Sequence, residues 1–146
     1  MSFSISAEDV KGLNDDQTAA IFDALVAAAW ADGTVSQVEK DSFEAELTKL
    51  PWNKPQDQLI KMIEASVGKV AAIKDRDGVM SFISGVADRL TDQNIREKVL
   101  YTMGVITFAD KDMSEAEKNV MKAFTELFKI PMDKAKDIAI AIRGGK

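Results

Sequence analysis

The sequence has 146 residues, of which 46% are hydrophobic and 29% are charged, and this balance predicts a folded domain with a real core. Cysteine and histidine are both absent, which excludes disulfides, cysteine nucleophiles, Ser-His pairs and structural zinc sites. The formal net charge of -5 disfavours binding to nucleic acid and to anionic membranes.

Apolar residues recur at helical spacing along nearly the whole chain, and the three prolines leave long stretches free to form helices. A short helix is predicted to begin after Ser6. The first long helix is predicted over about 16–31 and the second over about 37–50, where Pro51 ends it. Five further helices are predicted: one opening near Pro55, one after a break at 75–78, one capped by Thr91, one capped by Ser114, and one opening at Pro131.

No strand or hairpin pattern interrupts these helices in the sequence. We therefore predict an all-α fold in which residues 1–146 form a single compact domain of about seven helices. No apolar run reaches the roughly 18 residues of a membrane helix, and the N-terminus lacks the basic and apolar regions of a signal peptide. These observations predict a cytoplasmic protein without a membrane span.

An internal repeat is the most informative feature of the sequence, because residues 31–40 resemble residues 109–118 at an offset of 78 residues. The helices that precede the two copies also agree in their apolar pattern. We therefore predict a duplication whose halves span about 16–73 and 91–143. At this offset six residues have identical partners, five within residues 31–40 and one just after them: Ala31, Asp32, Ser36, Glu39, Lys40 and Ala45.

Each copy of the repeat contains the pattern Ser-x-x-Glu, from Ser36 to Glu39 and from Ser114 to Glu117. This spacing is typical of a capping box, in which the serine hydroxyl accepts a backbone N–H three residues on and the glutamate accepts the N–H of the serine. Helix initiation alone therefore suffices to explain both glutamates.

The aspartates of the repeat, Asp32 and Asp110, are harder to explain, because each follows a helix whose C-terminal end disfavours negative charge. Either each carboxylate accepts backbone N–H groups in an Asx-type turn, or the aspartates belong to a cation site. One turn cannot supply the roughly 6–8 oxygens that calcium prefers, so a site requires both turns. The candidate ligands for calcium, magnesium or manganese are Asp32, Glu39, Asp110, Asp112 and Glu117.

A helix that ends in Ala-Asp-Gly-x-Val-Ser-x-x-Glu, with a second copy half a domain later, resembles the TerB-like family of tellurite-resistance proteins. The resemblance implies an all-helical domain, a link to tellurite resistance and stress responses, a metal-binding acidic surface and no established enzymatic activity. The second copy departs from the pattern at Lys111, where the first has Gly33, and this weakens the case for the second turn. The family's acidic residues fall on Asp32, Glu39, Asp110 and Glu117.

A metal-independent helical adaptor is the alternative to a metal-responsive module. It would bind a protein partner through an acidic face or through Trp52, which is either an exposed anchor or part of the core. An enzyme that uses paired carboxylates is a third class, and no motif in the sequence supports it. We therefore predict a non-enzymatic protein that does not bind nucleic acid.

Overall fold

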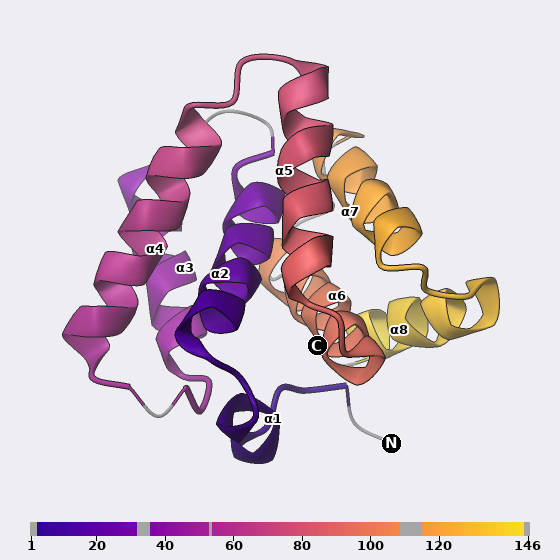
Figure 1. Ribbon diagram of the computed structural model, residues 1–146, viewed down its shortest axis with the longest axis horizontal. Coiled ribbons are helices and arrows are strands. Elements are labelled where there is room, and N and C mark those ends of the chain that lie inside the picture. The colour runs from indigo at the N-terminus through magenta and orange to yellow at the C-terminus, as the bar shows by residue number, and fades with distance from the viewer. Residues whose placement is uncertain (1–2, 32–35, 53, 109–114, 145–146) are drawn as a thin grey trace.

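The computed structural model describes residues 3–31, 36–52, 54–108 and 115–144 (Figure 1). Over these residues the chain forms eight α-helices and no strand, which confirms the prediction of an all-α fold. The short helix predicted at the N-terminus precedes seven longer ones. The helices are α1 (Ala7–Lys11), α2 (Asp15–Ala29), α3 (Gln37–Thr48), α4 (Gln56–Ala71), α5 (Arg76–Arg89), α6 (Gln93–Phe108), α7 (Glu115–Leu127) and α8 (Met132–Gly144).

Two helix starts differ from the sequence prediction. The segment 75–78 is predicted to break the chain, whereas Asp75 caps α5 and the next residues form its first turn. The Asp75 carboxylate accepts the backbone N–H of Gly78 at 2.8 Å. Similarly, Asp92 takes the capping role predicted for Thr91, because its carboxylate accepts the N–H two residues on at 2.9 Å. In both places an aspartate supplies the oxygen that the first turn of the helix requires.

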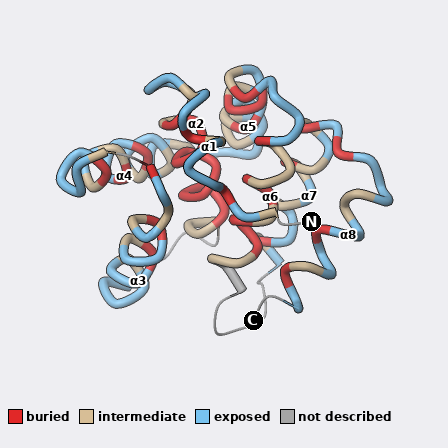
Figure 2. The backbone as a smooth tube through the Cα atoms, turned by 90° about the horizontal axis from the view of Figure 1, so that it is seen from below, coloured by how far each residue is buried: buried red, intermediate tan, exposed pale blue. Residues whose placement is uncertain are grey.

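The central helix of the molecule is α2, with α3 and α4 on one side and α5 to α8 on the other (Figure 1). It packs against α4, α5, α6 and α7, and ten of its fifteen residues are buried. Figure 2 shows buried positions gathered along α2 and along the sides of other helices that face it. Within the described chain, no helix is both long and apolar enough to cross a membrane.

The two halves of the chain end their helices differently, although the sequence repeats Lys49-Leu50-Pro51 as Lys129-Ile130-Pro131. Lys129 has a φ of 56°, in the left-handed region, whereas Lys49 has a φ of -71°. After α7 the N–H of Ile130 donates to the Thr125 carbonyl at 3.1 Å and that of Lys129 to Glu126 at 3.0 Å, the bonds of a Schellman motif. The repeated segment thus has a different conformation in each half of the chain, and the internal duplication of the sequence stays a prediction.

A single arginine, Arg96 of α6, holds the C-terminal ends of α5 and α7. Its guanidinium donates to the Ala87 carbonyl at 2.8 Å, to the Phe128 carbonyl at 3.3 Å and to the Leu90 carbonyl. It also lies 5.6 Å from the centre of the Phe128 ring. Because helix C-termini carry partial negative charge, one cation here stabilises two helix ends at once.

The N-terminal segment is fixed to α6 through Asp9. The Asp9 carboxylate accepts hydrogen bonds from Lys98 Nζ at 2.7 Å, from the Ser6 N–H at 2.9 Å and from Asn94 Nδ2 at 3.3 Å. Burial by itself would raise the pKa of this carboxyl, but the hydrogen bonds from Lys98 and Ser6 and the Lys98 charge outweigh burial and lower the pKa.

The lowered pKa predicts that Asp9→Asn costs stability at neutral pH but not in acid. A group whose folded-state pKa is depressed adds stability above its unfolded-state pKa of about 3.9, and this stability is lost as the pH falls through the folded-state pKa. In urea denaturation, the difference in the free energy of unfolding between Asp9→Asn and wild type should be constant down to about pH 5 and narrow as the pH falls below about 4. Glu8→Gln, at an exposed neighbour, is the control. A difference that does not narrow at all as the pH falls below about 4 contradicts the prediction.

Candidate functional site

Two of the five predicted cation ligands, Glu39 and Glu117, lie in the part of the chain that the structure describes. The other three, Asp32, Asp110 and Asp112, lie outside the described residues, as does the predicted cap of α7. Glu39 is the third residue of α3 and Glu117 is the third residue of α7. The two glutamates of the repeat therefore hold equivalent places in their helices.

Glu39 forms the predicted capping box with Ser36. Its N–H donates to Ser36 Oγ at 3.1 Å, and its Oε1 accepts the Ser36 N–H at 2.9 Å. The interpretation as a helix cap is therefore confirmed for the first copy of the repeat. Since the Glu39 side chain is exposed, a cation that approached it would compete with the Ser36 N–H for Oε1.

Glu117 has a different environment, because only 3% of its surface is exposed. It is one of five polar or charged residues that are buried in the described chain. A carboxylate is stable in such a place only when charges or hydrogen bonds compensate for lost hydration. The repeat thus places one glutamate in solvent and its counterpart in the interior.

No group of three or more acidic side chains that could hold a metal ion occurs within residues 3–31, 36–52, 54–108 and 115–144. Glu39 and Glu117 together have four carboxylate oxygens, fewer than the roughly 6–8 that calcium prefers. A cation site of the predicted kind therefore needs ligands from outside these ranges.

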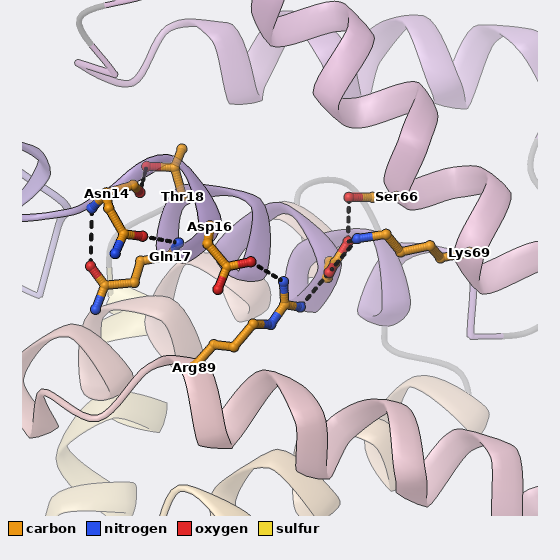
Figure 3. A network of polar contacts seen from close by, with 8 residues as sticks. Asn14, Asp16, Gln17, Thr18, Ser66, Lys69 and Arg89 are labelled. Atoms are coloured by element: carbon orange, nitrogen blue, oxygen red, sulfur yellow. Dashed lines mark hydrogen bonds and ion pairs between the residues drawn. The ribbon is translucent and has the colours of Figure 1, made fainter.

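The structure brings together a polar cluster that the sequence analysis missed, in which Ser66, Lys69 and Arg89, labelled in Figure 3, surround Asp23 of α2. The fully buried Asp23 carboxylate accepts hydrogen bonds from Ser66 Oγ of α4 at 2.6 Å and from Arg89 Nη2 of α5 at 2.5 Å. Lys69 Nζ of α4 lies 3.1 Å from Oδ2, and Arg89 also reaches Asp16 at 3.4 Å. This Asp23 cluster joins three helices and balances two carboxylates with two cations.

A sequence signal for this cluster exists in α2. Asp23 is the single charged residue between Ala19 and Ala31, a segment that is otherwise apolar. A lone carboxylate in an apolar helix predicts buried partners. Its partners Ser66 and Arg89 are 43 and 66 residues away, so local spacing does not identify them.

The members of the Asp23 cluster differ in exposure, and this difference shows that the carboxylate depends on its cations. The side chains of Lys69 and Arg89 are 49% and 27% exposed, whereas that of Asp23 is 0% exposed. Water can therefore hydrate the cations but not the carboxylate. Every buried side-chain nitrogen and oxygen in the described chain has a hydrogen-bond partner, so the cluster presents no unsatisfied group to a ligand.

Trp52 is not an exposed anchor for a partner, and this part of the adaptor alternative is wrong. It is 2% exposed, and its indole N–H donates to the Leu47 carbonyl at 2.8 Å. Its ring packs edge-on against Phe22, with the ring centroids 4.8 Å apart. Both the ring and the N–H of Trp52 are satisfied inside the protein, where they fix the end of α3 against α2.

The fold and these clusters define an all-helical domain in which some of the described polar residues cap helices, while Asp23 and Asp9 join helices through buried or partly buried ion pairs. The chain belongs to the tellurite resistance protein TerB family, because the family model of that description matches residues 17–139. The match runs from the first turn of α2 into α8 and confirms the resemblance carried by the repeat. Comparisons with curated proteins and with solved structures give no match. The chain is thus a module of the tellurite-resistance type, and TerB domains are generally non-catalytic.

Proposed function

We propose that this chain is a non-enzymatic, cytoplasmic stress-response module that binds a divalent cation between its two acidic turns. The observation that supports the proposal best is the acidic pattern that recurs in the sequence of a TerB-family chain, with Glu39 and Glu117 in the first turns of their helices at equivalent positions. The proposed ligands are Asp32, Glu39, Asp110, Asp112 and Glu117.

The chemistry of the available ligands restricts the cation. The chain has no cysteine or histidine, so metals that prefer thiolate or imidazole ligands have none here. Carboxylate oxygens suit calcium, magnesium and manganese. Binding would also reduce the net charge of -5 and the repulsion among the acidic side chains of the two turns.

Thermal melts of chelator-treated protein, titrated with each of the three cations at fixed ionic strength, test the proposal. At ten times its Kd, a cation that binds only the folded state adds about 1.4 kcal/mol to the free energy of unfolding and raises Tm by about 4 °C. The double variant Asp32→Asn/Asp110→Asn should lose this rise. The matched control Glu64→Gln/Asp88→Asn, at exposed carboxylates outside the turns, should keep it. If none of the three ions raises Tm, the cation proposal is abandoned.

A metal-independent adaptor is the second candidate. The observation that favours it is the exposure of several carboxylates on α3, among them Asp41 and Glu46. Binding of a basic protein partner that persists in chelator and is lost in Asp41→Asn/Glu46→Gln would favour the adaptor over the cation module.

A further inference from the structure

Three of the four large hydrophobic residues that are exposed in the described chain lie on α3 and α8. Met132 and Ile140 of α8 are 75% and 67% exposed, and Val38 of α3 is 78% exposed. Figures 1 and 2 show α3 and α8 on opposite sides of the molecule. The fourth residue, Met80 of α5, is less exposed at 41%.

The exposed side of α8 combines apolar and positively charged residues. Asp133 and Asp137 lie along one edge of this side, and Ile138 and Ile142 are buried on the opposite side. The cations of the exposed side are Lys136 and Arg143. Within the described chain, neither of them forms an ion pair, so both are available to a partner. The residues recur at three- and four-residue spacing and form what we call the basic face of α8: Met132, Lys136, Ala139, Ile140 and Arg143.

The exposed side of α3 has the complementary composition. Its charged members are carboxylates, and Glu46 shares only an exposed ion pair with Lys49 at 3.3 Å, which stabilises little. The buried residues Phe43 and Leu47 hold the opposite side of the helix against the core. The exposed residues, again at three- and four-residue spacing, form the acidic face of α3: Val38, Asp41, Ser42, Ala45 and Glu46.

Formal charge is also divided unevenly along the chain. Residues 118–146 contain seven Lys or Arg and three Asp or Glu, a net charge of +4, so the remaining residues carry -9 to give the total of -5. The segment with the positive excess includes all of α8, and the segment with the negative excess includes all of α3. The two helices have the same signs, because α8 contains three Lys or Arg and two Asp, whereas α3 contains one Lys and four Asp or Glu. Opposite charge therefore favours contact between α8 of one copy and α3 of another.

We propose that the basic face of α8 binds the acidic face of α3 on a second copy of this chain. The contact would cover Met132 and Ile140 with Val38, and it would set Lys136 and Arg143 beside the carboxylates of α3. Contact between two α8 helices is less favourable, because it brings the Lys136 and Arg143 cations of both copies together. An anionic membrane is disfavoured as the occupant, because the -9 charge of the remaining chain repels it.

The proposed contact joins different surfaces of identical molecules, so each copy that binds still has one face to offer. Such a heterologous contact produces open chains of molecules rather than a closed dimer. Two short helix faces form a small interface, and we expect weak association with a Kd on the order of 0.1 mM. High salt should weaken it, because screening removes the attraction between exposed charges.

Analytical ultracentrifugation in the presence of chelator tests self-association independently of the cation site. The weight-average mass should rise above the monomer mass of 16.0 kDa as the protein approaches about 1 mM. The α8 variant Lys136→Glu/Arg143→Glu and the α3 variant Asp41→Asn/Glu46→Gln should each stay monomeric. Mixing the two variants should restore dimers of about twice the monomer mass and nothing larger, because each variant keeps one intact face.

Lys61→Glu/Lys74→Glu is the matched control, since it changes the net charge as much as the α8 variant does but at exposed sites outside both faces. It should associate like the wild type. The proposal is overturned if the wild type keeps the monomer mass at about 1 mM. It is also overturned if the control loses self-association as completely as the α8 variant does. Binding to phosphatidylserine vesicles that the α8 variant loses, without self-association of the wild type, would assign the basic face to a membrane and also overturn it.

Discussion

Arg89→Met is expected to lower the free energy of unfolding by about 3 kcal/mol, because it leaves the buried Asp23 carboxylate without its closest cation. Arg89 Nη2 lies 2.5 Å from Asp23 Oδ2, and the carboxylate has no exposed surface through which water could replace it. Ser66 and the half-exposed Lys69 remain as partners, so the loss falls at the lower end of the range for broken buried ion pairs. Urea denaturation measures the difference.

Removing the other partner of the ion pair, by Asp23→Asn, should lower the free energy of unfolding less than Arg89→Met does. It removes the charge that is buried and leaves Arg89 and Lys69, whose side chains are 27% and 49% exposed and can be hydrated. The side-chain carbonyl of the introduced asparagine would also still accept the Ser66 hydroxyl. In the double variant Asp23→Asn/Arg89→Met, part of the loss should be recovered, because no unpaired buried charge remains.

Lys54→Met is the matched control for the arginine substitution. Lys54 Nζ lies 2.6 Å from Asp15, but the Asp15 side chain is 81% exposed, so the pair contributes at most about 1 kcal/mol. A loss for Arg89→Met as small as that of the control, or smaller than that of Asp23→Asn, would contradict the role assigned to the Asp23 cluster.

Gly104→Ala is expected to destabilise the protein by about 2 kcal/mol, although alanine is the better helix former. A Cβ at Gly104 of α6 would lie 2.2 Å from Ile142 Cδ1 and 2.9 Å from Ile142 Cγ1 of α8. Ile142 is buried and branched at Cβ, so its side chain has little room to move and α8 has to shift. Denaturant melts of the variant would report the loss.

Gly68→Ala is the control for the glycine substitution, because a Cβ at Gly68 of α4 meets nothing within 4 Å. It should stabilise the protein by about 0.5–1 kcal/mol through helix propensity alone. Ile142→Val should cost about 1 kcal/mol in the wild type and less in Gly104→Ala, because it removes the methyl group that clashes first. Equal costs of Ile142→Val in the two backgrounds would contradict the steric explanation.

The sequence by itself determined the helical class of this protein and most of its helix limits. Apolar spacing and proline positions are local features, and hydrogen bonds within a helix join residues only four apart, so both can be read along the chain. The Ser36 capping box was predictable for the same reason, as was the TerB resemblance carried by the repeated turn. Where capping residues compete, as at Thr91 and Asp92, the choice between neighbours was wrong by one residue.

Only the tertiary structure decided which equivalent residues share an environment and which distant ones meet. Glu39 and Glu117 have the same place in the repeat, yet one is exposed and the other is buried. The sequence left open whether Trp52 is exposed or buried. In the structure it packs against Phe22, thirty positions earlier in the chain. Asp23 meets Ser66 and Arg89 because three helices cross there. Burial and charge pairing depend on how helices pack across long sequence separations, and the periodicity of a single helix contains no information about its neighbour.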